Sequence, residues 1–293
     1  MLLPKFEFYE PTSIQEAIDL KKKYRGKAKL MAGGTDLLVH LKKKLVTADH
    51  LISLAKIKEL SQVQQAGDTL KIGTCVTMSQ LSKSAVIQEK FGAIKTASDN
   101  LGTHLIRNRA TLGGNVCNAS PAGEALPSLI VYQAQVRLQG PEGKRKIPVE
   151  SFFKGPGKTD IHEGEILVGF QLPLPEKNYG AHYLQLGKRK SSEINVVNVA
   201  AFVEINPADQ TVKTARIALG SVAATPIRSF HAEDVLTNKA PGEAVFYEAG
   251  EAARHKDCQP IDDFRGTAAY RRAMIGVLTK RTLETACKLA MAQ

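Results

Sequence analysis

Short apolar runs and amphipathic segments alternate along the first 55 residues, and this pattern predicts a small β-α-β-α-β unit. In "KFEFYEPTSIQEAIDLKKKY" we expect a short strand, a turn and a helix capped by Thr12 or Ser13, with Glu16 at capping-box distance from Ser13. The apolar residues of that helix share one face: Ile14, Ala17, Ile18 and Leu20. "AKLMAGG" then predicts a strand entering a glycine loop, "TDLLVHLKKK" a short helix, and "DHLISL" another strand.

The pattern changes at about residue 56. From "TLKIGTCVTMSQL" onward we expect strand-like segments, followed by an amphipathic helix at about residues 89–101 and a second glycine loop. "GEALPSLIVYQA" predicts a helix, whereas "QVRLQG", "GKRKIPVESFF" and "EILVGFQLPLP" predict strands. Proline and glycine in "PLPEKNYG", residues 173–180, mark the expected domain boundary.

Beyond this boundary, "INVVNVAAFVEINPADQTVKTARIALGSVAATPIR" predicts three strands with a turn at residues 206–209. Two helices are expected at about residues 229–254 and 266–291. The whole pattern therefore predicts an α+β protein with a domain at 1–176, divided near residues 55 and 56, and a smaller α+β domain at 177–293.

Two glycine pairs interrupt the predicted elements, one in "MAGGTDLLVH" and one in "RATLGGNVCNASPAGEALPSLIVY". Adjacent glycines between a strand and a helix let backbone N–H groups approach a ligand closely, and phosphate is the usual ligand of such a turn. A diphosphate has two phosphoryl groups, so each loop could take one of them. Neither loop has the spacing of a dinucleotide-binding G-x-G-x-x-G or of a P-loop.

Either pair alone is also compatible with a plain turn, because glycine is a common turn residue. For the second pair, that alternative is a tight turn in which a hydroxyl and an amide cap a helix. The second loop is the more specific of the two, because Thr111 precedes its glycines while Asn115 and "NASPAGE" follow them.

Together, "AGGTDLL" and "IRNRATLGGNVCNASPAGEALPSLI" resemble the two flavin-diphosphate loops in the FAD-binding medium subunits of the molybdenum hydroxylases, the xanthine dehydrogenase and carbon monoxide dehydrogenase family. The opening "FEFYEPTSIQEAIDL" resembles the usual start of these subunits. "DDFRGTAAYRRAMIGVLTKRTL", residues 262–283, resembles a signature near their C-terminus. The resemblance therefore extends over the whole chain.

This resemblance implies a two-part FAD-binding domain of the vanillyl-alcohol oxidase-like type, followed by a C-terminal domain of the carbon monoxide dehydrogenase flavoprotein type. It implies an electron-transfer role in which FAD takes electrons from 2Fe-2S clusters on a small subunit and delivers them to an external acceptor, NAD or another carrier. The substrate would be oxidised at a molybdopterin centre on a large subunit. No catalytic side chain and no metal ligand is expected in this chain, since the flavin carries the chemistry.

By the same resemblance, the first loop would cradle the FAD diphosphate and the second would take its other side. Glu124 would lie near the adenosine, Leu101 beside the isoalloxazine, and Leu167 would make a backbone contact. The expected cofactor-binding residues are Lys29, Leu30, Met31, Ala32, Gly33, Gly34, Thr35, Asp36, Leu101, Thr111, Leu112, Gly113, Gly114, Asn115, Glu124, Leu167 and Gln185. The chain departs from the family pattern at Gln185, where lysine is common, and at Glu193, where aspartate is common.

Several of these residues also have plain structural interpretations. Asp36 and Glu124 are each compatible with an ordinary place at a helix start, because carboxylates are favoured there. His104 has no carboxylate, serine or cysteine partner in the sequence and is expected to cap or pack a helix end. Cys117 lies inside the second loop without a basic neighbour, so we interpret it as a structural thiol.

Composition narrows the function further. The net charge of +11 would suit acidic cofactors or partners, but the chain has no Trp and its lysine runs are short, so nucleic-acid binding is not expected. The four cysteines are too far apart for a C-x-x-C metal site. No apolar run is long enough for a membrane span or a signal peptide, which makes the cytoplasm the expected location.

Two other functions stay open on sequence grounds. A stand-alone reductase of the UDP-N-acetylenolpyruvoylglucosamine reductase type has a similar FAD fold, but it would need a serine or cysteine and a glutamate for proton transfer. A non-enzymatic, positively charged binding module is the other alternative.

Overall fold

The computed structural model describes residues 2–189 and 191–293. Its strands are β1 (Glu7–Tyr9), β2 (Ala28–Met31), β3 (His50–Ser53), β4 (Val63–Ala66), β5 (Thr69–Gly73), β6 (Gln135–Gly140), β7 (Gly143–Pro148), β8 (Phe153–Gly155), β9 (Lys158–Thr159), β10 (Ile166–Pro173), β11 (Tyr179–Leu186), β12 (Val197–Ile205), β13 (Val212–Gly220) and β14 (Ile227–Arg228). Its helices are α1 (Ile14–Lys23), α2 (Leu37–Lys42), α3 (Met78–Lys83), α4 (Ala85–Lys90), α5 (Gly92–Asn100), α6 (His104–Arg107), α7 (Leu112–Asn118), α8 (Ala125–Val131), α9 (Val149–Phe152), α10 (Phe230–Leu236), α11 (Glu243–Ala252) and α12 (Ala268–Met291). Single turns of 3₁₀ and π helix occupy Lys58–Ser61 and Ala253–Asp257.

The N-terminal unit has the predicted β-α-β-α-β order, and its three strands form a parallel sheet in the order β1-β3-β2. Ser13 caps α1, because its hydroxyl accepts a hydrogen bond from the amide of Glu16 at 3.2 Å. The Glu16 carboxylate reaches back to the amide of Thr12 at 2.8 Å and not to that of Ser13. Ala17 and Ile18 bury the apolar face of the helix against the sheet.

The second unit is a five-stranded antiparallel sheet in the order β4-β5-β10-β6-β7, covered by the short helices α3 to α8. Here the strand-like interpretation of "TLKIGTCVTMSQL" is correct only for β5. The hydroxyl of Thr77 accepts from the amide of Gln80 at 3.2 Å, and the Gln80 side chain accepts from the amide of Thr77 at 2.8 Å. This capping box starts α3, so the chain is helical well before the helix expected at residues 89–101.

The last unit is a four-stranded antiparallel sheet in the order β11-β12-β13-β14, with the predicted turn at residues 206–209. The helix expected at residues 229–254 is two helices, α10 and α11. Pro241 and Gly242 lie between them, and proline cannot continue the hydrogen bonding of a helix interior. The expected C-terminal helix is α12, which lies along β11 and β12.

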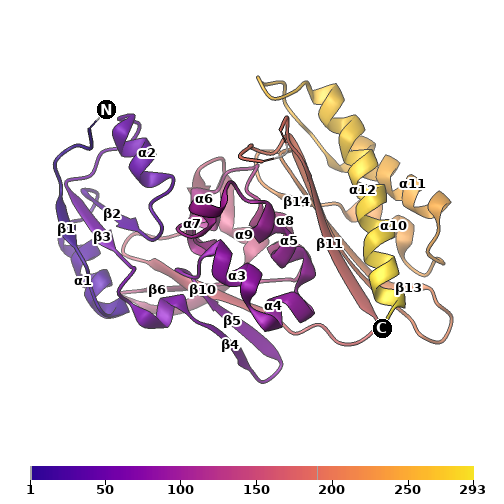
Figure 1. Cartoon of the computed structure of the whole chain (residues 1–293), viewed down its shortest axis with the longest axis horizontal. Helices are drawn as coiled ribbons and strands as arrows, with labels where there is room; N and C mark the ends of the chain where they lie inside the picture. The colour runs from indigo at the N-terminus through magenta and orange to yellow at the C-terminus, as the bar shows by residue number, and fades with distance from the viewer. Residues whose placement is uncertain (1, 190) are drawn as a thin grey trace.

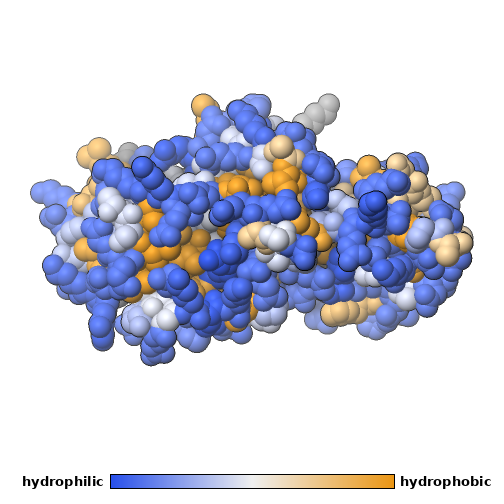
Figure 2. All heavy atoms as spheres, turned by 90° about the horizontal axis from the view of Figure 1, so that it is seen from below, coloured by the Kyte–Doolittle hydropathy of each residue, from blue (hydrophilic) through white to orange (hydrophobic). Residues whose placement is uncertain are grey.

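Strand β12 is buried on both faces. Val199, Ala201 and Val203 pack toward the C-terminal helices, while Ala200 and Phe202 pack into the core of the second unit, with α5 and α8. The largest core therefore crosses the expected domain boundary. Figure 1 shows the resulting order of layers, with the N-terminal sheet at one end, helices α3 to α8 in the middle, then the four-stranded sheet, and α12 at the other end. The face in Figure 2 is mostly hydrophilic, with hydrophobic side chains gathered in several separate areas.

Candidate functional site

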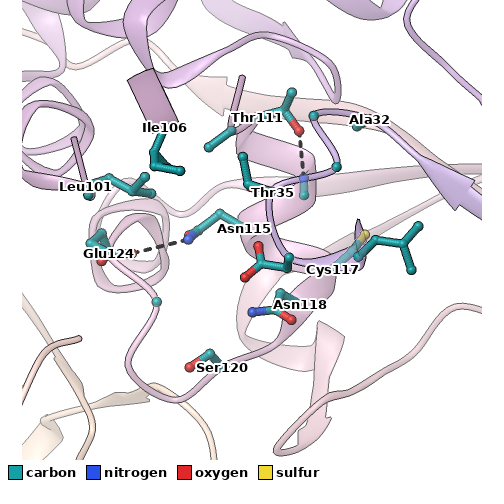
Figure 3. A pocket seen from close by; sticks show the side chains of 18 of the residues that line it. Ala32, Thr35, Leu101, Ile106, Thr111, Asn115, Cys117, Asn118, Ser120 and Glu124 are labelled. Carbon is teal, nitrogen blue, oxygen red and sulfur yellow. Dashed lines mark hydrogen bonds between the residues drawn. The ribbon is translucent and has the colours of Figure 1, made fainter. Parts of the chain in front are cut away.

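A cavity of about 570 Å³ opens where the N-terminal unit, the helices of the second unit and a loop of the last unit meet. Its wall includes most of the expected cofactor residues: Lys29, Leu30, Met31, Ala32, Gly33, Gly34, Thr35, Asp36, Leu101, Thr111, Gly114, Asn115 and Glu124. Figure 3 shows Thr35, Thr111, Asn115 and Glu124 arranged around the same space. The volume is within the range of cavities that hold small molecules.

The first glycine loop leaves the end of β2, an edge strand, and turns into α2. Gly33 lies against the backbone of Arg109, where an added Cβ would be 1.9 Å from the carbonyl oxygen. Gly34 has a φ of +77°, a conformation that residues with a side chain rarely adopt. Glycine is therefore required at the two positions for different reasons, close backbone packing at Gly33 and a left-handed conformation at Gly34.

The amides of this loop are free to bind a ligand. Within residues 2–189 and 191–293, the N–H groups of residues 32–36 donate no hydrogen bond to another protein group. Asp36 stands at the N-cap of α2, but its side chain makes no capping hydrogen bond. Successive unpaired N–H groups around a concave turn form an anion-binding nest, so a phosphate group fits the chemistry of this loop.

The second glycine pair is built differently, since it lies in the first turn of α7 and not in an open loop. The hydroxyl of Thr111 accepts a hydrogen bond from the amide of Gly114 at 3.0 Å, and the amide of Gly113 donates to the carbonyl of Thr74 at 3.0 Å. A Cβ on Gly113 would lie 1.7 Å from the Thr74 Oγ1. The expectation that both glycine loops present free amides therefore holds only for the first. The second presents a hydroxyl and the amide side chain of Asn115.

A polar pair crosses the floor of the cavity. The Nδ2 of Asn115 donates to the Glu124 carboxylate at 3.3 Å, and its Oδ1 accepts from the amide of Ala125 at 3.3 Å. Burial raises the pKa of Glu124 to about 7, and the negative charge of Asp36 adds to the shift. Glu124 stands at the N-cap of α8, its side chain makes no capping bond, and it lines the cavity.

The rim combines apolar and charged groups. Leu101 is almost fully buried, and its carbonyl accepts from the Arg107 guanidinium at 2.9 Å. The last unit contributes Glu193, whose carboxylate accepts from the Arg189 Nε at 2.8 Å, a bond that lowers the pKa of Glu193. The Ser191 hydroxyl donates to the carbonyl of Gly102 at 3.3 Å and ties this loop to the second unit.

Four expected residues lie outside the cavity wall: Leu112, Gly113, Leu167 and Gln185. Leu112 and Leu167 are buried in the largest core, and β10 is bulged directly after Leu167. Gln185 lies on β11, where its Oε1 accepts from the Tyr183 hydroxyl at 2.9 Å.

The structure also places His104 and Cys117, the two residues for which the sequence predicts a purely structural role. His104 is exposed at the start of α6 and does not line the cavity. Cys117 does line it, and burial raises the pKa of its thiol to about 12. The expectation that it has no basic neighbour is wrong, because the charge of Lys21 acts on the thiol in the lowering direction, but burial outweighs it. A thiol with so high a pKa is a poor nucleophile at neutral pH.

Sequence reasoning missed much of the opposite wall: Asn118, Ser120, Ala122, Gly123, Ser192 and Ile194. Asn118 and Ser120 lie in the quoted second loop, so their place in the motif was a usable signal. Ser192 and Ile194 reach the cavity only because the four-stranded sheet packs on α5 and α8, and nothing local in the sequence indicates that packing.

Two further findings concern metals and membranes. No three His, Cys, Asp or Glu side chains converge as a metal site within the part of the chain that the structure describes. In the same residues, no helix combines the length and the apolar character that crossing a bilayer requires.

The cavity groups can bind and orient an anionic ligand through amides, hydroxyls and an amide side chain.

Comparison with known proteins identifies two family models along the chain. Residues 4–175 match the FAD binding domain in molybdopterin dehydrogenase, and residues 182–286 match the CO dehydrogenase flavoprotein C-terminal domain.

Whole-chain relatives agree with these matches. The carbon monoxide dehydrogenase medium chain of Hydrogenophaga pseudoflava is 32% identical over 286 residues, which is 98% of each chain. The xanthine dehydrogenase FAD-binding subunit of Escherichia coli O157:H7 is 30% identical, over 97% of this chain and 96% of that one. Among solved structures, a chain of the Hydrogenophaga pseudoflava carbon monoxide dehydrogenase superimposes with a TM-score of 0.93 over 98% of both chains, at 32% identity.

Proposed function

The chain belongs to the FAD-binding medium subunits of the molybdopterin-dependent hydroxylases, the carbon monoxide and xanthine dehydrogenase family, and we propose that it relays electrons from 2Fe-2S clusters on a partner subunit to an external acceptor. It is the oxidoreductase flavoprotein subunit of such a complex, and residues 4–175 are its FAD-binding domain. The observation that carries the proposal is the run of unpaired amides at residues 32–36, which faces a cavity of suitable size.

In this proposal the first glycine loop holds the FAD diphosphate. Its amides donate to phosphate oxygens, while the Thr35 hydroxyl and Asp36 line the rim. Thr111, Gly114 and Asn115 form the facing wall, where the missing side chain of Gly114 leaves room for close approach. This arrangement suits a diphosphate because the first wall supplies free N–H donors, and the second adds the Thr111 hydroxyl and the Asn115 side chain beside the open space at Gly114.

The other proposed contacts come from around the cavity. Glu124 would accept a hydrogen bond near the adenosine, and Leu101 would pack on the flavin ring. Leu112, Gly113, Leu167 and Gln185 remain in the proposal only as residues that shape the wall from behind, because they do not line it. We further propose residues 1–176 and 177–293 as the two domains, in keeping with the extents of the two family models.

When bound, FAD supplies the electron transfer, and the protein supplies binding, orientation and shielding from water. The apolar groups of Leu101, Ile106 and Ile194 line the cavity, and of these Leu101 is buried while Ile106 and Ile194 are exposed at its rim. The Asn115 amide holds the Glu124 carboxylate in place, and burial leaves that carboxylate protonated in a large fraction of molecules near neutral pH.

The proposed partners are a small subunit with 2Fe-2S clusters and a large subunit with the molybdopterin centre. Relatives described as a medium chain and as an FAD-binding subunit support a multisubunit assembly. The proposed acceptor is NAD or another carrier. The net charge of +11 would favour an acceptor that bears phosphate or an acidic partner surface.

The test is to express the chain alone and together with neighbouring large and small subunits, and to measure substrate-driven dye reduction in each preparation. We expect the lone chain to carry FAD, to show at most slow dye reduction with NADH, and to oxidise no substrate of the molybdenum hydroxylases. Full turnover by the lone chain with NADPH and a small enol-ether substrate would instead favour the stand-alone reductase. A colourless preparation under all conditions would reject both functions.

A further inference from the structure

Three successive carbonyl groups, those of residues 121–123, each accept a hydrogen bond from the C-terminal half of the chain. The amide of Ser221 donates to the first at 2.7 Å, the Nδ2 of Asn195 to the second at 3.0 Å, and the Nδ2 of Asn198 to the third at 3.2 Å. This segment ends directly before Glu124 and contributes two residues to the cavity wall. The wall is therefore held from behind by a different part of the chain.

Each asparagine side chain uses both N–H groups of its amide, one for the wall and one for Tyr183. Asn195 and Asn198 are fully buried, and each also donates to the hydroxyl of Tyr183, at 3.4 and 3.0 Å. The Tyr183 hydroxyl in turn donates a hydrogen bond to the Gln185 Oε1 at 2.9 Å. Each NH₂ group thus has one proton for the wall and one for the tyrosine, so neither asparagine can turn away without leaving a buried donor unpaired.

The network is anchored in the long C-terminal helix. Arg271 of α12 is almost fully buried and donates to the carbonyls of Val196 and Ser221, both at 2.9 Å. The Ser221 hydroxyl donates to the carbonyl of Asn195 at 3.2 Å. These bonds fix the backbone from which the donors to the wall project, so the three contacts act as one unit.

We propose that Asn195 and Asn198 are positioning residues that hold segment 121–123, and with it Glu124, in the geometry that binds FAD. The inference rests on the proposed function of the cavity and extends it to residues that touch no cofactor. Without the two amide donors, the segment keeps its local bonds to Ser120, and of the three bonds from the C-terminal half only the one from Ser221 is left. Water then reaches the carbonyls from behind, and the Glu124 side chain loses its fixed backbone.

The main test measures the dissociation constant of FAD by quenching of flavin fluorescence on the full chain prepared without cofactor. The Asn195→Ala/Asn198→Ala double variant should bind FAD at least tenfold more weakly, because two buried hydrogen bonds behind the wall are lost. Thr282→Val is the matched control. It removes a fully buried hydroxyl bond of 2.7 Å within α12 that touches no part of the cavity, and it should leave the dissociation constant unchanged.

A second readout separates positioning from a general loss of stability. The free energy of unfolding is measured against pH in the chain without FAD, for the parent, for the double variant, and for each of them with Glu124→Gln added. The difference between a protein and its Glu124→Gln counterpart is the contribution of Glu124 to the pH dependence. The other titratable groups that face Glu124 are Asp36 from the first loop and Tyr183 from β11, and both stay in every variant. The double variant should lose half or more of this contribution, since Glu124 becomes hydrated.

The outcomes are distinct. If the double variant does not fold, Tyr183→Phe keeps the buried ring, removes the hydroxyl that both asparagines share, and should weaken FAD binding about threefold. FAD affinity within twofold of the parent in the variant that folds would overturn the proposal. Weaker binding with an unchanged Glu124 contribution would also overturn it, because the loss would not have passed through the wall. A parent chain that binds no FAD would reject the proposed function itself.

Discussion

Gly33 and the carbonyl of Arg109 lie so close together that a Cβ at position 33 would be 1.9 Å from the oxygen. Arg109 comes shortly before the second glycine pair, so this contact joins the two sides of the cavity at their base. The separation of the two sides is therefore set by backbone against backbone, which cannot adjust as a flexible side chain does. Substitution at this position is a direct test of the site.

Gly33→Ala should abolish retention of FAD and lower the free energy of unfolding by about 1–3 kcal/mol, since an overpacked contact must push the first loop away from Arg109. Gly242→Ala is the control, because a Cβ there meets no atom within 4 Å and the residue lies in extended backbone. The ratio of flavin to protein absorbance, together with thermal melting, checks both. Parent-like flavin content in Gly33→Ala would contradict the close packing.

Gly114→Val should also remove FAD, for a different reason. Its Cβ would lie 2.9 Å from the Thr111 Oγ1 and would project a branched side chain at the cavity wall. Gly34→Val should act similarly, because a φ of +77° strains a β-branched residue. Flavin content after gel filtration measures the effect, and near-complete occupancy in both variants would reject the assignment of these two walls.

Glu124 should make the stability of the FAD-free chain depend on pH. Its pKa is about 7 in the folded chain and 4.5 for an unperturbed glutamate, so its contribution is fully present below pH 4.5 and is lost as the pH rises through 7. At 1.36 kcal/mol per pKa unit, the loss is about 3 kcal/mol. Denaturant unfolding of the parent and of Glu124→Gln at pH 5 and pH 8 checks this. An equal pH dependence in the two proteins would show that Glu124 is not buried as described.

FAD should be bound without a covalent link. Cys117 is the cysteine that lines the cavity, and burial holds its thiol pKa at about 12, which keeps it protonated and unreactive at neutral pH. Acid precipitation should therefore release all of the yellow colour into the supernatant. Cys117→Ala should keep its flavin. Colour that stays in the protein pellet of the parent but not of the variant would identify a thioether link.

The parts of the fold that depend on local signals were predicted from the sequence. Ser13 caps its helix, the glycine loop follows β2, and the first 55 residues form the expected unit, because capping, turn chemistry and periodicity act over a few residues. The error at α3 was of the same local kind. Thr77 and Gln80 have capping-box spacing, but the β-branched residues before them suggested a strand.

The rest depends on contacts between distant residues. Position 113 requires glycine because Thr74 leaves no room there for a Cβ. Two of the donors to segment 121–123 are the side chains of Asn195 and Asn198, more than 70 residues away in the sequence. In sequence, a glycine pair looks the same whether its amides face a phosphate or a neighbouring carbonyl. The packing of sheets and helices determines which of the two holds, and only the structure shows it.

Strand β12 has a consequence for how this protein can change over evolution. Ala200 and Phe202 pack into a core formed mostly by the first half, whereas Val199 and Val203 pack into the core of the C-terminal half. The two halves therefore meet in a shared packed interface, and the side chains on each side of it must fit those on the other. A chimaera joined at residues 173–180 would import foreign side chains against α5 and α8, together with a foreign backing for the cofactor wall. The two halves are therefore expected to diversify together, as one inherited unit, even though their sequences are recognisable separately.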